Sequence, residues 1–208
     1  MSKFDVAALT WDEKPARVNI ARSVAEEVKD LVPLERNFKI LDFGCGTGLV
    51  SFFLADSVGA IVGVDSSKGM VDVFNKKAQK SQINAAAYQM DLMREDLKNR
   101  DFDLIVSSMT FHHIKDPVAI LKKLNIYLKD NGYMAVADLL KEDGTFHEDN
   151  EGVEHFGFDI EEFEGYLRAS GFADVHKKII FKVEKEREGF NREYPVFLII
   201  GKKLEGIR

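Results

Sequence analysis

A short apolar segment that ends in three alternate glycines is the feature that most constrains how this chain can fold. Residues 40–43 have the composition of a buried β-strand, and Gly44, Gly46 and Gly48 follow at once. Residues 49–58 then have the composition of a helix. Glycine permits a positive φ and a close approach of a ligand to the backbone, while free amides at a helix start attract negative charge. The segment predicts a strand–loop–helix unit that binds a nucleotide-like cofactor, with a purely structural tight turn as the alternative.

The spacing of the glycines argues against a dinucleotide. Dinucleotide-binding loops follow G-x-G-x-x-G, but Leu49 stands where that pattern requires its last glycine. The sequence DFGCGTG at residues 42–48 instead resembles motif I, (D/E)-x-G-x-G-x-G, of the class I S-adenosylmethionine-dependent methyltransferases. The resemblance implies that S-adenosylmethionine is the cofactor and binds at the carboxyl-terminal edge of a seven-stranded sheet. The residues that it assigns to the cofactor here are Asp42, Gly44, Cys45, Gly46 and Gly48.

The length and composition of the chain predict one globular domain over residues 1–208. The chain is 45% hydrophobic and 31% charged, with 4 prolines and a single cysteine, which excludes an internal disulfide. No apolar run approaches the roughly 18 residues of a membrane span. Residues 1–5 lack the apolar region of a secretory signal, so we expect a cytoplasmic protein without membrane contact. The formal net charge of −6 argues against general nucleic-acid binding.

Strand-like and helix-like segments alternate along most of the chain. This alternation is typical of a doubly wound α/β sheet. The resemblance implies a Rossmann-like, seven-stranded, mainly parallel sheet with helices on both faces and an antiparallel strand from a C-terminal hairpin. The expected strands cover residues 40–43, 60–65, 86–90, 101–108, 133–138, 175–183 and 195–200, with a charged turn at 184–189 between the last two.

The same pattern divides the domain into four parts. Residues 1–36 are expected to form an N-terminal helical cap, and residues 37–140 the cofactor-binding core. Residues 141–158 are polar, contain three glycines, and predict a long loop over the substrate side of the site. Residues 159–208 are expected to form a helix and the terminal β-hairpin.

Acidic residues end the second and third expected strands. Asp65 follows Gly44 by 21 positions, near the spacing at which such folds place a carboxylate on ribose hydroxyls. Asp65, with Ser66 beside it, suits a nicotinamide cofactor and S-adenosylmethionine alike. By resemblance, Asp91 binds the adenine amino group, and Met90 and Leu92 enclose the ring. The alternative for Asp91 is a turn aspartate that caps a short helix at residues 93–98.

The fourth expected strand carries the second resemblance. Residues 101–106, DFDLIV, resemble the family's motif IV, which implies that the backbone around Ser107 faces the methionine end of the cofactor. A sulfonium methyl group is already electrophilic, so the protein mainly aligns a nucleophile with it. Where a base helps, the candidates are His113, His112 and then Asp138, in that order. Their alternative role is to cap or hydrogen-bond loops.

Histidines and acids also occur in the 141–158 loop. His147 and His155, with Glu148 and Glu154, have a spacing that matches no common metal site, and we therefore predict no metal.

Three functional hypotheses follow from these residues. The leading one is an S-adenosylmethionine-dependent methyltransferase that acts on a small-molecule nucleophile. The second is a catalytically silent cofactor-binding subunit that acts with a partner protein. The third is a nicotinamide-dependent oxidoreductase, which Leu49 and the lack of a Tyr-x-x-x-Lys pair after the fourth strand disfavour. The acceptor atom and the oligomeric state have no sequence signature that we recognise.

Overall fold

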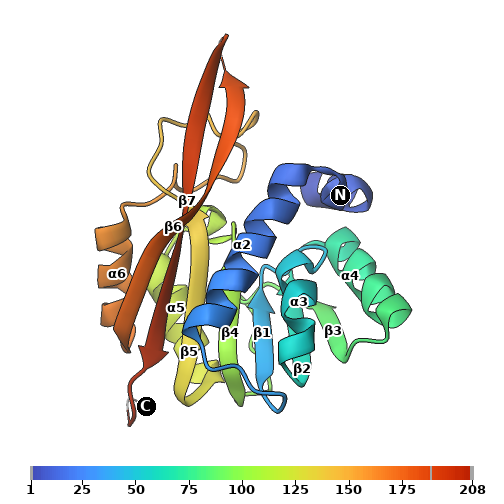
Figure 1. Cartoon of the computed structure of the whole chain (residues 1–208), viewed down its shortest axis with the longest axis vertical. Coiled ribbons are helices and arrows are strands. Elements are labelled where there is room, and N and C mark those ends of the chain that lie inside the picture. The colour runs from blue at the N-terminus through green and yellow to red at the C-terminus, as the bar shows by residue number, and fades with distance from the viewer. Residues whose placement is uncertain (1, 188, 207–208) are drawn as a thin grey trace.

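A single seven-stranded sheet forms the centre of the molecule (Figure 1). The computed structural model describes residues 2–187 and 189–206. The strand order is β3-β2-β1-β4-β5-β7-β6. The strands are β1 (Lys39–Phe43), β2 (Ala60–Asp65), β3 (Ala85–Gln89), β4 (Phe102–Ser108), β5 (Leu128–Leu139), β6 (Phe172–Arg187) and β7 (Phe190–Lys203).

Strands β1 to β5 pair in parallel, whereas β7 is antiparallel to both β5 and β6. The predicted doubly wound, mainly parallel sheet with an antiparallel terminal strand is therefore confirmed. The chain moves outward from β1 in one direction up to β3 and then restarts at β4 on the other side of β1. In open α/β sheets, ligands bind where the strand order reverses, beyond the carboxyl ends of the strands. Here this position lies beyond β1 and β4.

Helices cover both faces of the sheet, as predicted (Figure 1). The apolar side chains of one face pack against three helices, and those of the other face pack against two. The first set is α2 (Pro15–Leu31), α3 (Leu49–Leu54) and α4 (Lys68–Ser81), and the second is α5 (Pro117–Tyr127) and α6 (Ile160–Ala169). Each fully buried Val, Leu, Ile or Phe side chain in these layers contributes about 1.5–3 kcal/mol to folding.

The helix boundaries follow from local sequence. Pro15 occupies the first turn of α2, where its missing amide costs nothing, and the helix stops before Pro33. Asp159 caps α6, because its Oδ1 accepts hydrogen bonds from the amides of Glu161 and Glu162.

Short helical segments complete the chain. At the N-terminus, α1 (Lys3–Ala7) leads into the 3₁₀ helix η1 (Ala8–Glu13), and two further 3₁₀ turns are η2 (Ala55–Ser57) and η3 (Phe111–His113). The predicted helix over residues 49–58 is thus shorter than expected, because α3 ends at Leu54 and tightens into η2.

Two predicted boundaries in the second half of the chain were wrong. The strand expected over residues 133–138 begins at Leu128, because helix α5 ends at Tyr127 and Leu128 pairs with Phe102 as the start of β5. The predicted charged turn at residues 184–189 is strand up to Arg187, so the β6–β7 hairpin extends well beyond the rest of the sheet (Figure 1). The described part of the chain contains no helix that is long and apolar enough to cross a membrane.

Candidate cofactor and acceptor site

The glycine loop, residues 44–48, connects β1 to α3 and is hydrogen-bonded to the carboxyl end of β2. The amides of Gly44 and Cys45 both donate to the carbonyl of Val64, at 2.9 and 3.0 Å. Gly44 has φ +70°, and a Cβ there would lie 2.2 Å from Oγ1 of Thr110. Gly46 has φ +51°, but a Cβ there would meet nothing nearer than Sδ of Met70 at 4.0 Å. The loop is therefore closed on the side of β4 and open in front of Gly46, where a ligand can approach.

Two carboxylates lie beneath this loop. Asp42 is buried at the end of β1 and accepts a 2.6 Å hydrogen bond from the Ser51 hydroxyl. Burial raises the pKa of Asp42 to about 7, and the charge of Asp65 adds to this effect. Asp65, at the end of β2, is partly buried and accepts 2.8 Å hydrogen bonds from the amides of Gly46 and Ser67. Burial also raises the pKa of Asp65. The charge of Asp65 acts on Asp42, so these two acids disfavour a bound anion and favour a ligand with positive charge.

The other residues predicted for the cofactor lie along the same edge. Ser66 is exposed directly after β2. Met90 is partly buried after β3, whereas Leu92 belongs to the core and is 1% exposed. Asp91 accepts a 2.9 Å hydrogen bond from the amide of Met93. Asp91 is therefore a turn residue, as in the alternative prediction, but residues 93–98 do not form the short helix that this alternative included. Ser107 is buried and donates to the carbonyl of Phe43 at 2.8 Å, which ties β4 to the start of the glycine loop.

The N-terminal segment lies across these loops. Oδ1 of Asp5 accepts hydrogen bonds from the Ser67 hydroxyl at 2.7 Å and the Gly69 amide at 3.0 Å. These bonds, with that from Gly69 the largest contribution, lower the pKa of Asp5. Asp12 accepts from the Thr47 hydroxyl and from Nζ of Lys77. The α1–η1 segment is thus anchored to the glycine loop and to the start of α4.

His112 and Asp138 form a buried pair at the ends of η3 and β5. Their exposed fractions are 2% and 0%, and Nδ1 of His112 lies 2.7 Å from Oδ1 of Asp138. Asp138 also accepts from the amides of His112 and Leu139. Such a hydrogen bond holds the proton on Nδ1 and leaves the lone pair on Nε2.

His113 lies beside this pair. The His112 and His113 ring centroids are 4.1 Å apart, and Nδ1 of His113 lies 2.6 Å from the carbonyl of Gly152. Burial lowers the pKa of His113 to about 4, with a further lowering by His112. The structure therefore brings together all three residues predicted as catalytic candidates. Both rings use Nδ1 to contact an oxygen, so each neutral ring has its Nε2 lone pair available.

His147 is a member of the same cluster that the sequence did not predict as an acid–base group. Its ring lies 5.0 Å from that of His112 and 5.8 Å from that of His113, measured between centroids. His147 lies 34 positions after His113 in the chain, so no local motif links them. His155, by contrast, lies against Phe158, and its Nε2 is 3.0 Å from the carbonyl of Ile114. Among residues 2–187 and 189–206, no group of three or more His, Cys, Asp or Glu side chains is arranged to hold a metal ion.

Two open hollows lie at the opposite edge of the sheet. One, of about 460 Å³, is lined by residues around Pro33, and the other, of about 270 Å³, by residues around Gly59 and Asn84. The strands begin at this edge, and none of the predicted site residues lines either hollow. The carboxyl-terminal edge remains the candidate site because the paired carboxylates and the histidine cluster lie there.

Comparisons with known proteins show what the chain is similar to. A family model described as a methyltransferase domain matches residues 40–132, which cover the glycine loop, Asp65, Asp91 and both catalytic-candidate histidines. An uncharacterized methyltransferase of Schizosaccharomyces pombe is 46% identical over 118 residues, which are 52% of this chain and 41% of the yeast protein. This chain therefore spans well under half the length of that relative.

Solved structures share the whole fold at low sequence identity. The Haemonchus contortus phosphoethanolamine N-methyltransferase 2, in complex with S-adenosyl-L-methionine, superposes with a TM-score of 0.71 at 16% identity, over 88% of this chain and 52% of that one. A putative methyltransferase from Haloferax volcanii, in complex with the Trm112 methyltransferase activator, gives a TM-score of 0.77 at 18% identity, over 99% of both chains. Residues 40–132 thus match a methyltransferase domain, and the seven-stranded fold is shared with solved methyltransferases, among them one in complex with S-adenosyl-L-methionine.

Proposed function

We propose that the protein binds S-adenosylmethionine at the carboxyl edge of β1, β2 and β3 and transfers its methyl group to a small-molecule nucleophile. The observation that carries the choice of cofactor is the pair of carboxylates at Asp42 and Asp65, with their raised pKa values. A cationic sulfonium and ammonium would relieve the repulsion between these acids, whereas a diphosphate would add to it. The Haemonchus relative that shares the fold binds the same cofactor.

Different residues along the carboxyl-terminal edge of the sheet would bind different parts of the cofactor. The open front of Gly46 gives room for close approach of the methionine end, together with Gly44, Cys45 and Gly48. Asp65 balances positive charge and is also placed to accept from ribose hydroxyls beside Ser66, and a bound cation lowers the pKa of Asp42 so that its carboxyl group ionises and adds to this balance. Asp91 and Met90 lie where an adenine would follow, while Leu92 supports them from the core and Ser107 fixes the loop to β4. The cofactor supplies an activated methyl group when bound.

The acceptor side is formed by the histidine cluster. In this proposal His113 receives the proton of the acceptor nucleophile at Nε2, and the His112–Asp138 pair holds the neighbouring ring in one tautomer and orientation. The α1–η1 segment and the 141–158 loop exclude water from the reacting atoms. The phosphoethanolamine methyltransferase with the same fold acts on a small molecule, which supports an acceptor of that size.

Isothermal titration calorimetry tests the cofactor assignment. We expect S-adenosylmethionine and S-adenosylhomocysteine to bind and NADH to give no heat. Asp65→Ala should weaken S-adenosylmethionine binding by about tenfold or more, because a hydrogen bond to a charged group contributes about 1.5–3 kcal/mol. Asp72→Ala is the matched control, since Asp72 pairs with Lys68 on the exposed face of α4. Binding of NADH in place of S-adenosylmethionine would overturn the assignment.

A second candidate function is a cofactor-binding subunit that needs a partner protein. The Haloferax volcanii methyltransferase that covers 99% of this chain was solved with an activator protein, which favours this possibility. Incubation with radiolabelled S-adenosylmethionine and fractionated cell extract separates the two. Transfer to a metabolite fraction by the isolated chain supports an autonomous enzyme, whereas transfer that requires an added protein fraction supports the subunit.

A further inference from the structure

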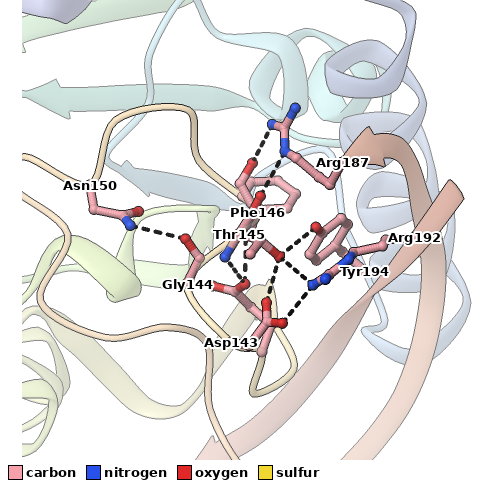
Figure 2. Close-up of polar contacts among 9 residues, drawn as sticks. Asp143, Gly144, Thr145, Phe146, Asn150, Arg187, Arg192 and Tyr194 are labelled. Carbon is pink, nitrogen blue, oxygen red and sulfur yellow. Dashed lines mark hydrogen bonds and ion pairs between the residues drawn. The ribbon is translucent and has the colours of Figure 1, made fainter. Parts of the chain in front are cut away.

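The 141–158 loop is held in place by the distal part of the β6–β7 hairpin (Figure 2). Nζ of Lys185 donates to the carbonyl of Phe146 at 2.7 Å and lies 3.6 Å from the centre of its ring. Arg187 donates to the carbonyls of Thr145 and Phe146, at 2.8 and 3.1 Å. The Tyr194 hydroxyl lies 2.7 Å from that of Thr145. Two cationic side chains of the hairpin, Lys185 and Arg187, thus contact Phe146, which directly precedes His147.

The Nε2 atom of His147 is buried and has no hydrogen-bond partner among the described residues. A buried imidazole nitrogen without a partner costs free energy, so such an atom commonly marks a position that a ligand completes. Its ring packs against His112 and His113, so this nitrogen belongs to the acceptor side of the site. Unlike His112 and His113, His147 has no recorded hydrogen bond at Nδ1 within the described residues, so its proton is free to reside on Nε2 and be donated.

Cationic side chains from two distant segments act on His147. Desolvation is the main cause that lowers the pKa of His147 to about 3, followed by the neighbouring His112 and His113 and by the charges of Lys185 and Lys3. Burial lowers the pKa of Lys185 to about 8, with repulsion from Arg187, Lys14 and Arg17. Acids also face this group: Glu148 acts on Lys185, Asp138 acts on His113 but also pairs with His112, and Oε2 of Glu142 accepts from the Phe146 amide. Asp12 acts on Arg17 but also pairs with Lys77. In a chain of net charge −6, such a local excess of positive charge indicates an anionic ligand.

We propose that the methyl acceptor carries an acid group, and that His147, Lys185 and Arg187 bind this group while the nucleophile faces His113. A phosphate or carboxylate accepts a hydrogen bond from the Nε2–H of His147 and neutralises the positive charges of Lys185 and Arg187. The acid group fixes the acceptor at one end, so that its other end lies in line with the methyl donor. This inference rests on the proposed methyltransferase function and adds the substrate class to it.

Three probes with one skeleton test the charge requirement. The full chain, saturated with S-adenosylhomocysteine, is titrated with phosphoethanolamine, β-alanine and ethanolamine, which share an aminoethyl group and end in phosphate, carboxylate and hydroxyl. We expect at least one of the two acids to bind tenfold or more tightly than ethanolamine. The tighter acid then tells a phosphate site from a carboxylate site. Equal binding of all three, or binding of none, overturns the anionic acceptor.

Variants test the residues. His147→Phe keeps the ring size and removes Nε2, and Lys185→Met keeps the length and removes the charge; each should weaken the tighter acid by about tenfold and leave S-adenosylhomocysteine binding unchanged. Lys182→Met is the control, because Lys182 lies on the same hairpin but pairs with Glu193. Unchanged affinity for the acid in both test variants overturns the assignment of these residues.

A transfer experiment separates the failure of this inference from the failure of the proposed function. Cell extract is divided on an anion-exchange resin at about pH 11, where amines have lost their charge and a zwitterionic acid is retained, and both fractions are returned to about pH 8 and incubated with the protein and radiolabelled S-adenosylmethionine. Label in the retained fraction supports the acidic acceptor. Label in the flow-through alone overturns it but leaves the methyltransferase function in place. Absence of cofactor binding and of transfer to either fraction overturns the proposed function, and with it this inference.

Discussion

The histidines beside Asp138 differ from free histidine in how they bind protons. Burial lowers the pKa of His113 to about 4 and that of His147 to about 3, so both imidazoles are neutral at pH 7. In the unfolded chain these groups protonate near pH 6.5, so their contribution to stability is present above that pH and is lost as pH falls toward 4. A neutral ring is also the state that accepts a proton from a nucleophile.

We therefore expect the Cε1–H signals of His113 and His147 to remain constant between pH 8 and pH 5.5. Two-dimensional NMR of histidine-labelled protein measures this, and His113→Phe and His147→Phe assign the two signals. A midpoint near pH 6.5 for either signal would contradict the burial that the structure gives these rings.

Asp42 has the opposite effect on stability. Its carboxyl group keeps its proton up to about pH 7 in the folded protein but ionises near 3.8 when unfolded. Between these values the native state binds more protons, so the free energy of unfolding falls as pH rises. The loss between pH 5 and pH 8 amounts to about 3 kcal/mol at ~1.4 kcal/mol per unit.

Asp42→Asn cannot titrate and should lack this loss. Urea unfolding of both proteins at pH 5 and pH 8 measures the difference. Relative to wild type, the variant should gain about 3 kcal/mol on going from pH 5 to pH 8, whatever its absolute stability. Parallel pH profiles for the two proteins would show that the carboxyl group is ionised at both pH values.

Among the elements, the α1–η1 segment depends for its position on Gly69 in α4. A Cβ at Gly69 would lie 2.9 Å from both Cα and the carbonyl oxygen of Asp5, and backbone atoms cannot move aside cheaply. Gly69→Ala should therefore displace the α1–η1 segment, which appears as at least tenfold faster hydrogen exchange in residues 3–13. Calorimetry should show weaker S-adenosylmethionine binding if that segment covers the cofactor.

Gly165→Ala is the matched control for this change. Gly165 lies exposed in α6, and a Cβ there would meet nothing within 4 Å. Replacing an exposed helical glycine by alanine stabilises a protein by up to about 1 kcal/mol. We expect Gly165→Ala to raise the free energy of unfolding by this amount without faster hydrogen exchange in residues 3–13. Equal behaviour of the two variants would mean that Asp5 does not dock against Gly69.

Some elements could be predicted from sequence and others could not, for identifiable reasons. Strand β2 begins and ends where predicted, because Ala60–Asp65 is an apolar run rich in β-branched residues, with Gly59 before it and the helix cap Ser67 after it. The outer part of β6 was missed because Lys185 and Arg187 look like turn residues in sequence. Their long side chains are in fact partly covered by the 141–158 loop, which is a tertiary contact without a local signal.

At the scale of the whole molecule, the candidate site was predictable only where its residues follow strand ends. Asp42, Asp65, Asp91 and Asp138 lie at or just after the ends of β1, β2, β3 and β5, so the parallel pairing of these strands brings them to one edge. His147 reaches the same edge from the middle of a loop, and its place is set by hydrogen bonds to a hairpin some 40 residues further along. Periodicity and motif spacing contain no information about such a contact.

The long hairpin also has a consequence for how such a protein diversifies. Residues 40–132, which match the family model, contain the groups that we propose for the methyl donor, and also His112 and His113 of the acceptor side, whereas the 141–158 loop and the strands that hold it come later in the chain. Substitutions on the outer hairpin can therefore reshape the acceptor side while the donor side keeps its sequence. The choice of methyl acceptor can therefore change without a change in cofactor binding. Exchanging residues 141–203 between relatives would be a direct route to new acceptors.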